Sequence, residues 1–150
     1  MIYIDFLFHA DKIAQASGTV FNRVSDHCIS RSDGNGRLLG GVIYSGFTSE
    51  SIAMHTAAFD RRWVNRDMLW VCFDYPFNQL GVQRVFGQVP EDNAAALAFD
   101  TKLGFKEVTR VPGVFKGGVG LIVMCMEKAD CRWLDIDAPM RAAALKQECA

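Results

Sequence analysis

Residues 93–105 decide the fold, and they read Asn-Ala-Ala-Ala-Leu-Ala-Phe-Asp-Thr-Lys-Leu-Gly-Phe. Alanine and leucine are strong helix formers, and Asn93 belongs to the residue types that cap a helix N-terminus. Gly104 is free to adopt the left-handed conformation that ends a helix, and Phe105 opens a β-rich run. The stretch therefore predicts a helix over residues 93–103 that reverses directly into a strand.

The segment before this helix predicts a strand, a helix and a second strand. Residues 51–59 and 82–89 are rich in strand formers, and between them apolar residues recur at helical spacing over 65–80. Asn65 is the expected N-cap, and Pro76 is expected to kink the helix. Such a unit should form a right-handed parallel crossover, with any ligand at the carboxyl end of its first strand, facing the helix N-terminus.

Local patterns predict the rest of the chain. Residues 33–36, Asp-Gly-Asn-Gly, are typical of a β-hairpin turn. Pro112 and Gly113 are expected in a loop between the last two strands. We therefore predict an α/β (α+β) chain with a mixed, mostly antiparallel sheet and helices on both faces. The remaining predicted elements are strand 2–8, helix 11–25, hairpin strands 27–31 and 37–47, strands 105–111 and 119–127, and a short helix from Pro139.

Composition limits the classes of partner. With 16 Lys and Arg against 17 Asp and Glu, the chain has a formal charge of −1, and half of its residues are hydrophobic. A chain of this length buries roughly 68–70% of its unfolded surface, which suits one domain over residues 1–150, with 134–150 as a tail or short helix. The near-neutral charge argues against nucleic acid or a membrane as partner.

Cysteine and histidine usage indicates the compartment and the lack of a metal. The five cysteines form no C-x-x-C pair, and the three histidines have no ligand spacing. We expect free thiols in a reducing, cytoplasmic environment, no metal site, and no targeting segment in the Asp-containing start of the chain.

In this context, the chain resembles the GNAT superfamily of acetyl-CoA-dependent N-acetyltransferases. Residues 93–105 are similar to its signature N-x-x-A-x-x-x-Y-x-K-x-G-F, except that Asp100 replaces the tyrosine. Residues 73–85 look like a helix and strand of the branch that acetylates protein N-termini. The resemblance covers about residues 37–128, and implies a GNAT-like acetyltransferase domain with acetyl-CoA between strands 51–59 and 82–89.

The family's phosphate loop, R/Q-x-x-G-x-G/A, corresponds to residues 60–65 here, which lack its glycines. Nearby arginines suit a diphosphate through bidentate contacts, whereas the alternative is a solvated surface loop. The resemblance also implies a strand bulge near residues 56–58 that would expose backbone groups to the pantetheine arm. The predicted cofactor residues are Thr56, Ala57, Ala58, Arg61, Arg62, Trp63, Val64, Asn65, Arg66, Asn93, Ala96, Phe99 and Lys102.

Candidate catalytic residues follow from direct attack of an amine on the thioester. His55 and Glu50 are the candidate bases, although His55 is equally typical of a core histidine. Asp100 takes the position of the family's acid, and a carboxyl group donates a proton near neutrality only if its pKa is raised. Tyr44 and Tyr75 are more remote candidates for the acid.

The sequence thus predicts an N-acetyltransferase acting on a primary amine: a protein N-terminus, a lysine or a small-molecule amine. The alternative is a non-catalytic GNAT-like module that binds acyl-CoA or a protein partner, and a third option is an interaction protein without cofactor. The oligomeric state stays open, with a homodimer as one option.

Overall fold

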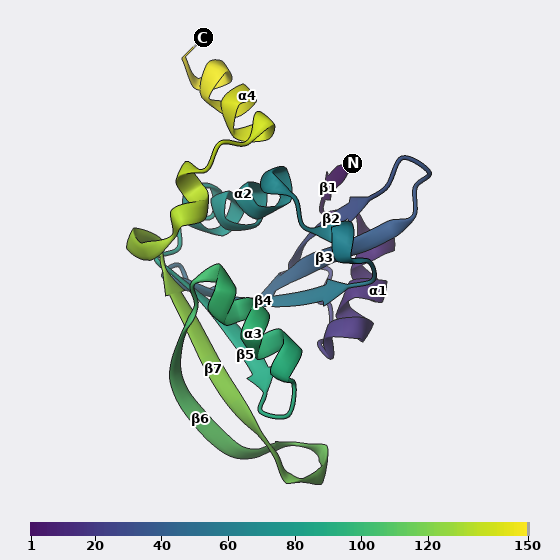
Figure 1. Cartoon of the computed structure of the whole chain (residues 1–150), viewed down its shortest axis with the longest axis vertical. Coiled ribbons are helices and arrows are strands. Elements are labelled where there is room, and N and C mark those ends of the chain that lie inside the picture. The colour runs from purple at the N-terminus through teal and green to yellow at the C-terminus, as the bar shows by residue number, and fades with distance from the viewer. Residues whose placement is uncertain (150) are drawn as a thin grey trace.

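The computed structural model describes residues 1–149, which form one seven-stranded sheet in the order β1-β2-β3-β4-β5-β7-β6 (Figure 1). Only β4 and β5 run parallel, so the predicted mixed, mostly antiparallel sheet is confirmed. The strands are β1 (Ile2–Ile4), β2 (His27–Ser32), β3 (Leu38–Ser45), β4 (Ser51–Ala58), β5 (Arg84–Pro90), β6 (Lys106–Phe115) and β7 (Val119–Glu127). The helices are α1 (Leu7–Ser17), α2 (Arg66–Asp74), α3 (Ala94–Leu103) and α4 (Pro139–Glu148).

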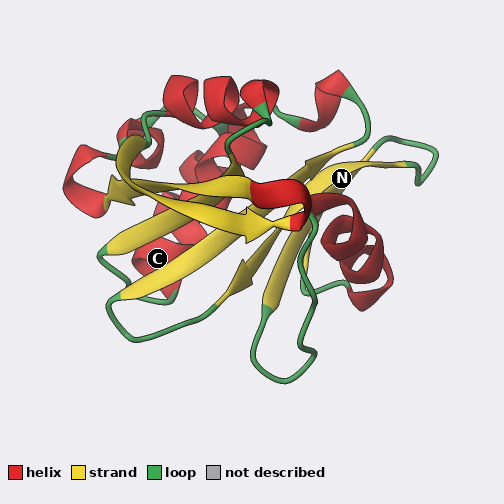
Figure 2. Ribbon diagram, turned by 90° about the horizontal axis from the view of Figure 1, so that it is seen from below, coloured by secondary structure: helices red, strands yellow, loops and turns green. Residues whose placement is uncertain are grey.

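Helices cover both faces of the sheet, as predicted (Figure 2). Successive side chains of a strand point to opposite faces, and β3 shows this clearly. Val42 and Tyr44 belong to the core beneath α2, whereas Ile43 packs with Ile13 of α1 on the other face. No helix within residues 1–149 is long and apolar enough to cross a membrane.

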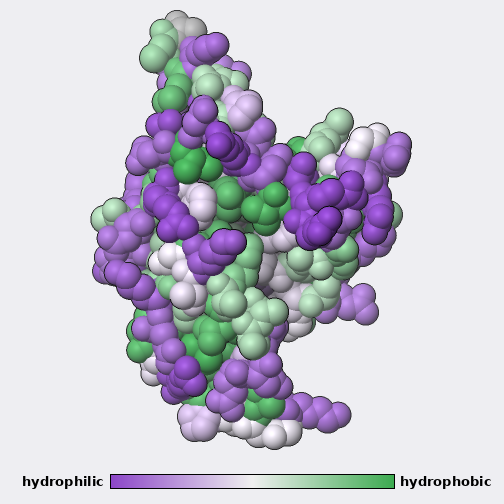
Figure 3. All heavy atoms as spheres, in the orientation of Figure 1, coloured by the Kyte–Doolittle hydropathy of each residue, from purple (hydrophilic) through white to green (hydrophobic). Residues whose placement is uncertain are grey.

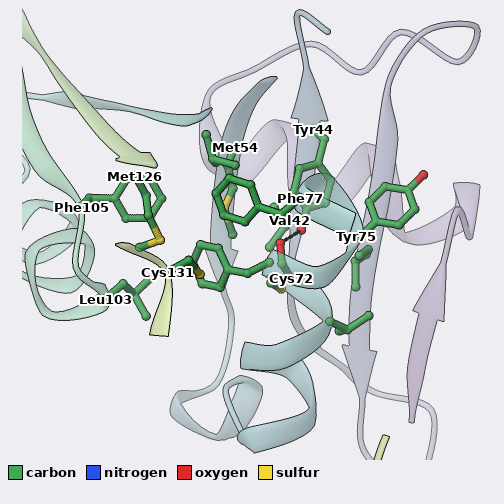
Figure 4. Close-up of a cluster of buried hydrophobic side chains, with 14 of the residues drawn as sticks. Val42, Tyr44, Met54, Cys72, Tyr75, Phe77, Leu103, Phe105, Met126 and Cys131 are labelled. Carbon is green, nitrogen blue, oxygen red and sulfur yellow. Dashed lines mark hydrogen bonds between the residues drawn. The ribbon is translucent and has the colours of Figure 1, made fainter. Parts of the chain in front are cut away.

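The main core lies between α2 and the sheet (Figure 4). Tyr44 of β3 is buried there, and its hydroxyl group donates a hydrogen bond of 2.6 Å to the carbonyl oxygen of Cys72. Phe77 and Met126 are also buried in this cluster. The packing fixes α2 over the parallel pair of strands, and therefore fixes the N-terminus of α2 near the end of β4.

The prediction of a strand over residues 2–8 is wrong beyond its first half. β1 ends at Ile4 because Asp5 adopts a left-handed conformation with φ of 54°. Its carboxylate accepts a hydrogen bond of 3.0 Å from the backbone N–H of Cys28, which offsets the strain of this conformation. This contact across 23 residues has no signal in the local alternation.

The predicted helix over 11–25 is displaced toward the N-terminus. The chain forms α1 (Leu7–Ser17), and Gly18 ends it in the left-handed conformation, with φ of 74°. Val20 and Val24, which the sequence placed on the buried stripe of this helix, are 86% and 96% exposed.

The effect of Pro76 on the predicted helix is a change of helix type. After α2 ends at Asp74, the chain makes a single π-helical turn over Tyr75–Gln79, in which the N–H of Leu80 bonds to the carbonyl oxygen of Tyr75 at 2.9 Å. The wider turn accommodates the proline, which an α-helical hydrogen-bond ladder would not.

The loop predicted around Pro112 is part of a strand. β6 continues to Phe115, and a shift of register between Val111 and Phe115 accommodates both Pro112 and Gly113. β6 is one of the two edge strands of the sheet, and on the outer side of such a strand a proline costs no ladder hydrogen bond. The short helix predicted from Pro139 is confirmed as α4.

Candidate active site

The parallel strands β4 and β5 part in the middle of the sheet. Their pairing runs only from Ser51–Arg84 to Met54–Gly87, although β4 continues to Ala58 and β5 to Pro90, and Figure 1 shows the strands pointing apart. The register of β3 with β4 runs without a shift, so the bulge implied by the resemblance is absent from β4. The last four residues of β4 therefore lack a partner strand on the β5 side.

A pocket of about 300 Å³ lies at this divergence, and we call it the splay pocket. It brings together His55 and Thr56 of β4 with Asn93, Ala96 and Asp100 at α3. All five residues were predicted site residues. The full lining is Ala16, Ser17, Gly18, Met54, His55, Thr56, Gln88, Val89, Pro90, Asn93, Ala96 and Asp100.

Glu50, the second candidate base, lies away from this pocket. Its backbone carbonyl accepts hydrogen bonds from the N–H groups of Gln83 and Arg84, at the start of the parallel pair. His55 follows five strand positions later, roughly 16 Å along the strand. Of the two candidate bases, only His55 therefore lines the splay pocket.

His55 is held by one hydrogen-bond partner on the neighbouring strand. Its Nε2 lies 2.9 Å from the Oγ of Ser45 in β3. Burial lowers the pKa of His55 below its ordinary value, and the opposing charge of Asp26 acts in the other direction. The imidazole is thus mostly neutral near pH 7, which is the form that accepts a proton.

Asp100 is a buried carboxyl group without a hydrogen-bond partner in the described part of the chain. The residue is 9% exposed and lies against Gly87 of β5, where a Cβ atom would stand 2.8 Å from its Oδ2. Burial raises the pKa of Asp100 to about 6. Near neutral pH, both forms are therefore populated, and the group is able to donate or accept a proton.

Neither tyrosine considered as an acid lines the splay pocket. The Tyr44 hydroxyl is bonded to a carbonyl of α2, and burial raises the pKa of Tyr44 well above its ordinary value. Burial likewise raises the pKa of Tyr75 to about 12. Asp100 is the acid candidate that the pocket contains.

The predicted arginines before α2 have separate surroundings. Arg62 forms a bidentate pair with Asp60, with Nε–Oδ1 and Nη2–Oδ2 distances of 2.9 and 2.8 Å, and this pair lowers the pKa of Asp60. Arg66 lies 3.6 Å from Asp137 at the surface. Of the three arginines, only Arg61 lines one of the pockets described here.

Trp63 stands where the family's loop has its first glycine, and it is a core residue. It is 7% exposed, and its ring centroid lies 5.9 Å from that of Phe99. Gly40 of β3 makes room for it, because a Cβ atom there would stand 2.8 Å from the Trp63 side chain. The space between α2, α3 and β4 is reduced to about 10 Å³. The loop is thus a packed element, with Asn65 capping α2 through a 2.8 Å bond from the N–H of Met68, as predicted.

A second pocket, of about 430 Å³, opens beside this packed loop, and we call it the outer pocket. Apolar surface gathers over α2 and α3 in the middle of this face (Figure 3). Arg132 and Trp133 were not among the predicted site residues, because they follow the last strand and have no spacing relation to the signature helix. The lining is Arg61, Trp63, Val64, Leu69, Phe99, Lys102, Leu103, Arg132 and Trp133.

The other predicted cofactor residues lie along the free end of β4 and at α3. Ala57 packs against α1 and Ala58 is exposed, so only their backbone groups face the divergence. The Oδ1 of Asn93 caps α3 by accepting a 3.1 Å bond from the N–H of Ala96, which leaves its amide nitrogen for a ligand. Across residues 1–149, no group of three or more His, Cys, Asp or Glu side chains is placed to hold a metal ion.

Comparisons with known proteins agree with this geometry at the level of fold. No protein-family model and no curated protein matches the sequence. Among solved structures, spermidine N-acetyltransferase from Vibrio cholerae in complex with CoA and spermine is similar, with a TM-score of 0.63 and 17% identity over 75% of this chain and 70% of that one.

Two further structures are similar to a comparable degree. A mutant form of the Vibrio cholerae spermidine/spermine N-acetyltransferase has a TM-score of 0.67 and 13% identity, over 86% of this chain and 96% of that one. The ribosomal-protein-S5-alanine acetyltransferase from Vibrio fischeri has a TM-score of 0.61 and 16% identity, over 71% of this chain and 64% of that one. Together with the order of strands and the parting of β4 from β5, these similarities show that the chain has the GNAT acetyltransferase fold.

Proposed function

We propose that this protein transfers an acetyl group from acetyl-CoA to a primary amine in the splay pocket. The observation that carries the proposal is the divergence of β4 and β5 after Met54–Gly87, next to a pocket that contains a histidine and a buried carboxyl group. The backbone groups of β4 beyond Met54 are suited to the amides of a pantetheine arm. The small Ala96 and the free amide nitrogen of Asn93 allow such an arm to approach α3 closely.

The fit to CoA is uneven along the molecule. The splay pocket suits the thioester end, whereas the glycine-free loop before α2 does not suit the family's backbone phosphate site. Trp63 fills the loop's inner side, and Arg62 is paired with Asp60. Side chains outside that loop therefore have to bind the phosphates of CoA.

The chemistry assigned to the chain's own residues is proton transfer and positioning. The neutral amine attacks the thioester carbonyl carbon, so that a C–N bond forms and the C–S bond breaks with its electron pair left on sulfur. His55, neutral because burial lowers its pKa, accepts the proton lost by the nitrogen. Asp100, in its protonated form, gives a proton to the departing sulfur. Holding both reactants in the pocket supplies much of the rate.

The lining of the splay pocket carries no positive charge that would repel an amine acceptor. Asp100 is the pocket's one ionisable carboxyl group, and the lining contains no lysine or arginine. The similar enzymes are named for different acceptors, spermidine in one case and ribosomal-protein-S5 alanine in another. The acceptor class we propose is thus a primary amine: a protein N-terminus, a lysine or a small-molecule amine.

A second candidate is a module that binds acyl-CoA, or a protein partner, without turnover. The contact between Trp63 and Phe99 favours it, because the space between α2 and β4 measures only about 10 Å³. Under this candidate, the histidine and the carboxyl group have structural roles only.

One experiment separates these candidates. The protein is titrated calorimetrically with acetyl-CoA, then incubated with spermidine, lysine and peptides with free N-termini while released thiol is followed. Binding with thiol release on any acceptor supports the transferase, and binding without release supports the module. Absence of binding contradicts both CoA-dependent candidates. For the transferase, His55→Gln should reduce turnover roughly 10²-fold or more.

A further inference from the structure

Three basic side chains of the outer pocket have no acidic partner. Arg61, Lys102 and Arg132 all line it, and no ion pair of theirs is found in the described residues. The lining contains no aspartate or glutamate. Neighbouring arginines differ in this respect, since Arg62 and Arg66 each face a carboxylate. The outer pocket is therefore a local excess of positive charge on a chain that is nearly neutral overall.

Arg132 is fixed in place before any ligand arrives. Its Nη2 donates a 2.7 Å hydrogen bond to the carbonyl oxygen of Lys102, and its guanidinium lies 4.3 Å over the ring of Trp133. The indole Nε1 of Trp133 in turn donates a 2.8 Å bond to the carbonyl oxygen of Leu103. The last carbonyl groups of α3 thus hold both side chains, which lowers the entropy cost of using Arg132 as an anion ligand.

The rest of the lining is aromatic and apolar. Trp63, Phe99 and Trp133 contribute rings, and Val64, Leu69 and Leu103 complete the surface. A pocket with this composition suits a ligand that joins a planar ring to a polyanion. Guanidinium groups bind phosphate oxygens in bidentate fashion and aromatic rings stack on nucleobases, so the matching class is a phosphorylated nucleotide.

A narrow space packed between α2, α3 and β4 shares lining residues with both the outer pocket and the splay pocket. The outer pocket shares Trp63, Val64, Leu69, Phe99 and Leu103 with this space, and the space shares Met54 and Thr56 with the splay pocket. A molecule with its nucleotide in the outer pocket would thus extend toward the place where β4 and β5 part. Phe99 is only half-buried, so its ring is the one that has to move for an arm to pass.

We propose that the outer pocket binds the phosphorylated nucleotide end of acetyl-CoA through Arg61, Lys102 and Arg132, in place of a backbone phosphate loop. This inference rests on the proposed function, because it identifies the residues that bind the nucleotide end of the same cofactor. It gives a role to Arg132 and Trp133, which lie outside the signature helix and the segment before α2. It also explains how the chain could still bind CoA although the loop over residues 60–65 lacks the family's glycines.

The test compares CoA with S-acetyl-pantetheine, which lacks the nucleotide. The variants Arg61→Gln, Lys102→Gln and Arg132→Gln are each titrated with CoA. Each substitution should raise the dissociation constant for CoA about ten- to a hundredfold. Thiol release from saturating S-acetyl-pantetheine should stay at the wild-type level, because that compound does not reach the outer pocket. Arg110→Gln, on the edge strand β6 and paired with Glu107, is the matched control and should leave both readouts unchanged.

The failure of this inference is distinguishable from the failure of the proposed function. If the wild-type protein uses S-acetyl-pantetheine but binds CoA no more tightly than S-acetyl-pantetheine, the proposed nucleotide site is wrong. The proposed acetyltransferase activity then still stands. Variants that bind CoA as tightly as the wild type also overturn it. A wild-type protein that neither binds nor uses either compound overturns both proposals. If Arg132→Gln fails to fold because the end of α3 loses its partner, Arg61→Gln and Lys102→Gln decide the question.

Discussion

Replacing Asp100 by asparagine should stabilise the protein increasingly as the pH rises. The carboxyl group is 9% exposed, has no hydrogen-bond partner in residues 1–149, and lies against the backbone of Gly87. Burial raises its pKa from 3.8 to about 6. The asparagine side chain has nearly the same shape and carries no charge, so it removes the cost of an ionised group in this position.

The sign follows from proton linkage. The folded state holds this proton up to about pH 6, whereas the unfolded chain releases it near pH 4, so the folded state binds more protons between these values. The contribution of Asp100 is fully favourable below pH 4 and is lost as the pH rises through 6. A shift of this size corresponds to about 3 kcal/mol in the free energy of unfolding, as an order of magnitude.

Urea denaturation of both proteins at several pH values measures this effect. The free energy of unfolding of Asp100→Asn, minus that of the wild type, should increase by about 3 kcal/mol between pH 4 and pH 8. Asp60→Asn is the contrasting control: pairing with Arg62 lowers the pKa of Asp60, so its contribution changes only below about pH 4, and its difference from the wild type should stay nearly constant between pH 4 and pH 8. A difference for Asp100→Asn that stays constant across this range would refute the assignment of Asp100 as a buried, unpartnered carboxyl group.

Further predictions concern the site and the packing beneath it. In His55→Gln, the fall in rate at low pH should disappear from the pH–rate profile. The reason is that His55, whose pKa is lowered by burial, must be neutral to accept a proton. If the fall in rate at low pH is unchanged, it belongs to another group. Ser45→Ala removes the 2.9 Å contact to His55 and should reduce kcat about tenfold, whereas Ser45→Thr should restore it. Gly40→Ala should destabilise the fold by about 1–3 kcal/mol in urea denaturation, because its Cβ would stand 2.7 Å from the carbonyl oxygen of Ala57. Gly34→Ala, with no atom within 4 Å, serves as its control, and equal effects of the two would contradict the packing described for Trp63.

The central part of the fold could be predicted because its signals are local. Asn65 and Asn93 cap helices by hydrogen bonds to residues three positions ahead, and Gly104 ends α3 within the same segment. The N-terminal prediction failed because a contact between Asp5 and Cys28, remote in sequence, decides where β1 ends. Local periodicity cannot report such a contact.

The candidate site shows the same division. Asp100 and Asn93 could be found because they occupy fixed positions of one helix, and the structure places both at the splay pocket. Arg132 and Trp133 could not be found, since each bonds to a carbonyl group 30 residues earlier, at the end of α3. The position of Trp63 was noted as a lost glycine, but its burial depends on the space that Gly40 leaves in β3.

The π-helical turn at Tyr75–Gln79 has a consequence for how this chain tolerates changes of length. Such a turn holds one residue more than an α-helical turn, so it is in effect an insertion that the crossover between β4 and β5 has absorbed. Deleting one residue there would convert it to an ordinary turn and leave α2 and β5 in their present register. The same deletion anywhere in α2 would rotate the buried Trp70 and Phe73 away from the sheet. Natural variation in length should therefore concentrate at this turn, which also contains the proline that an unbroken α-helix would not accept.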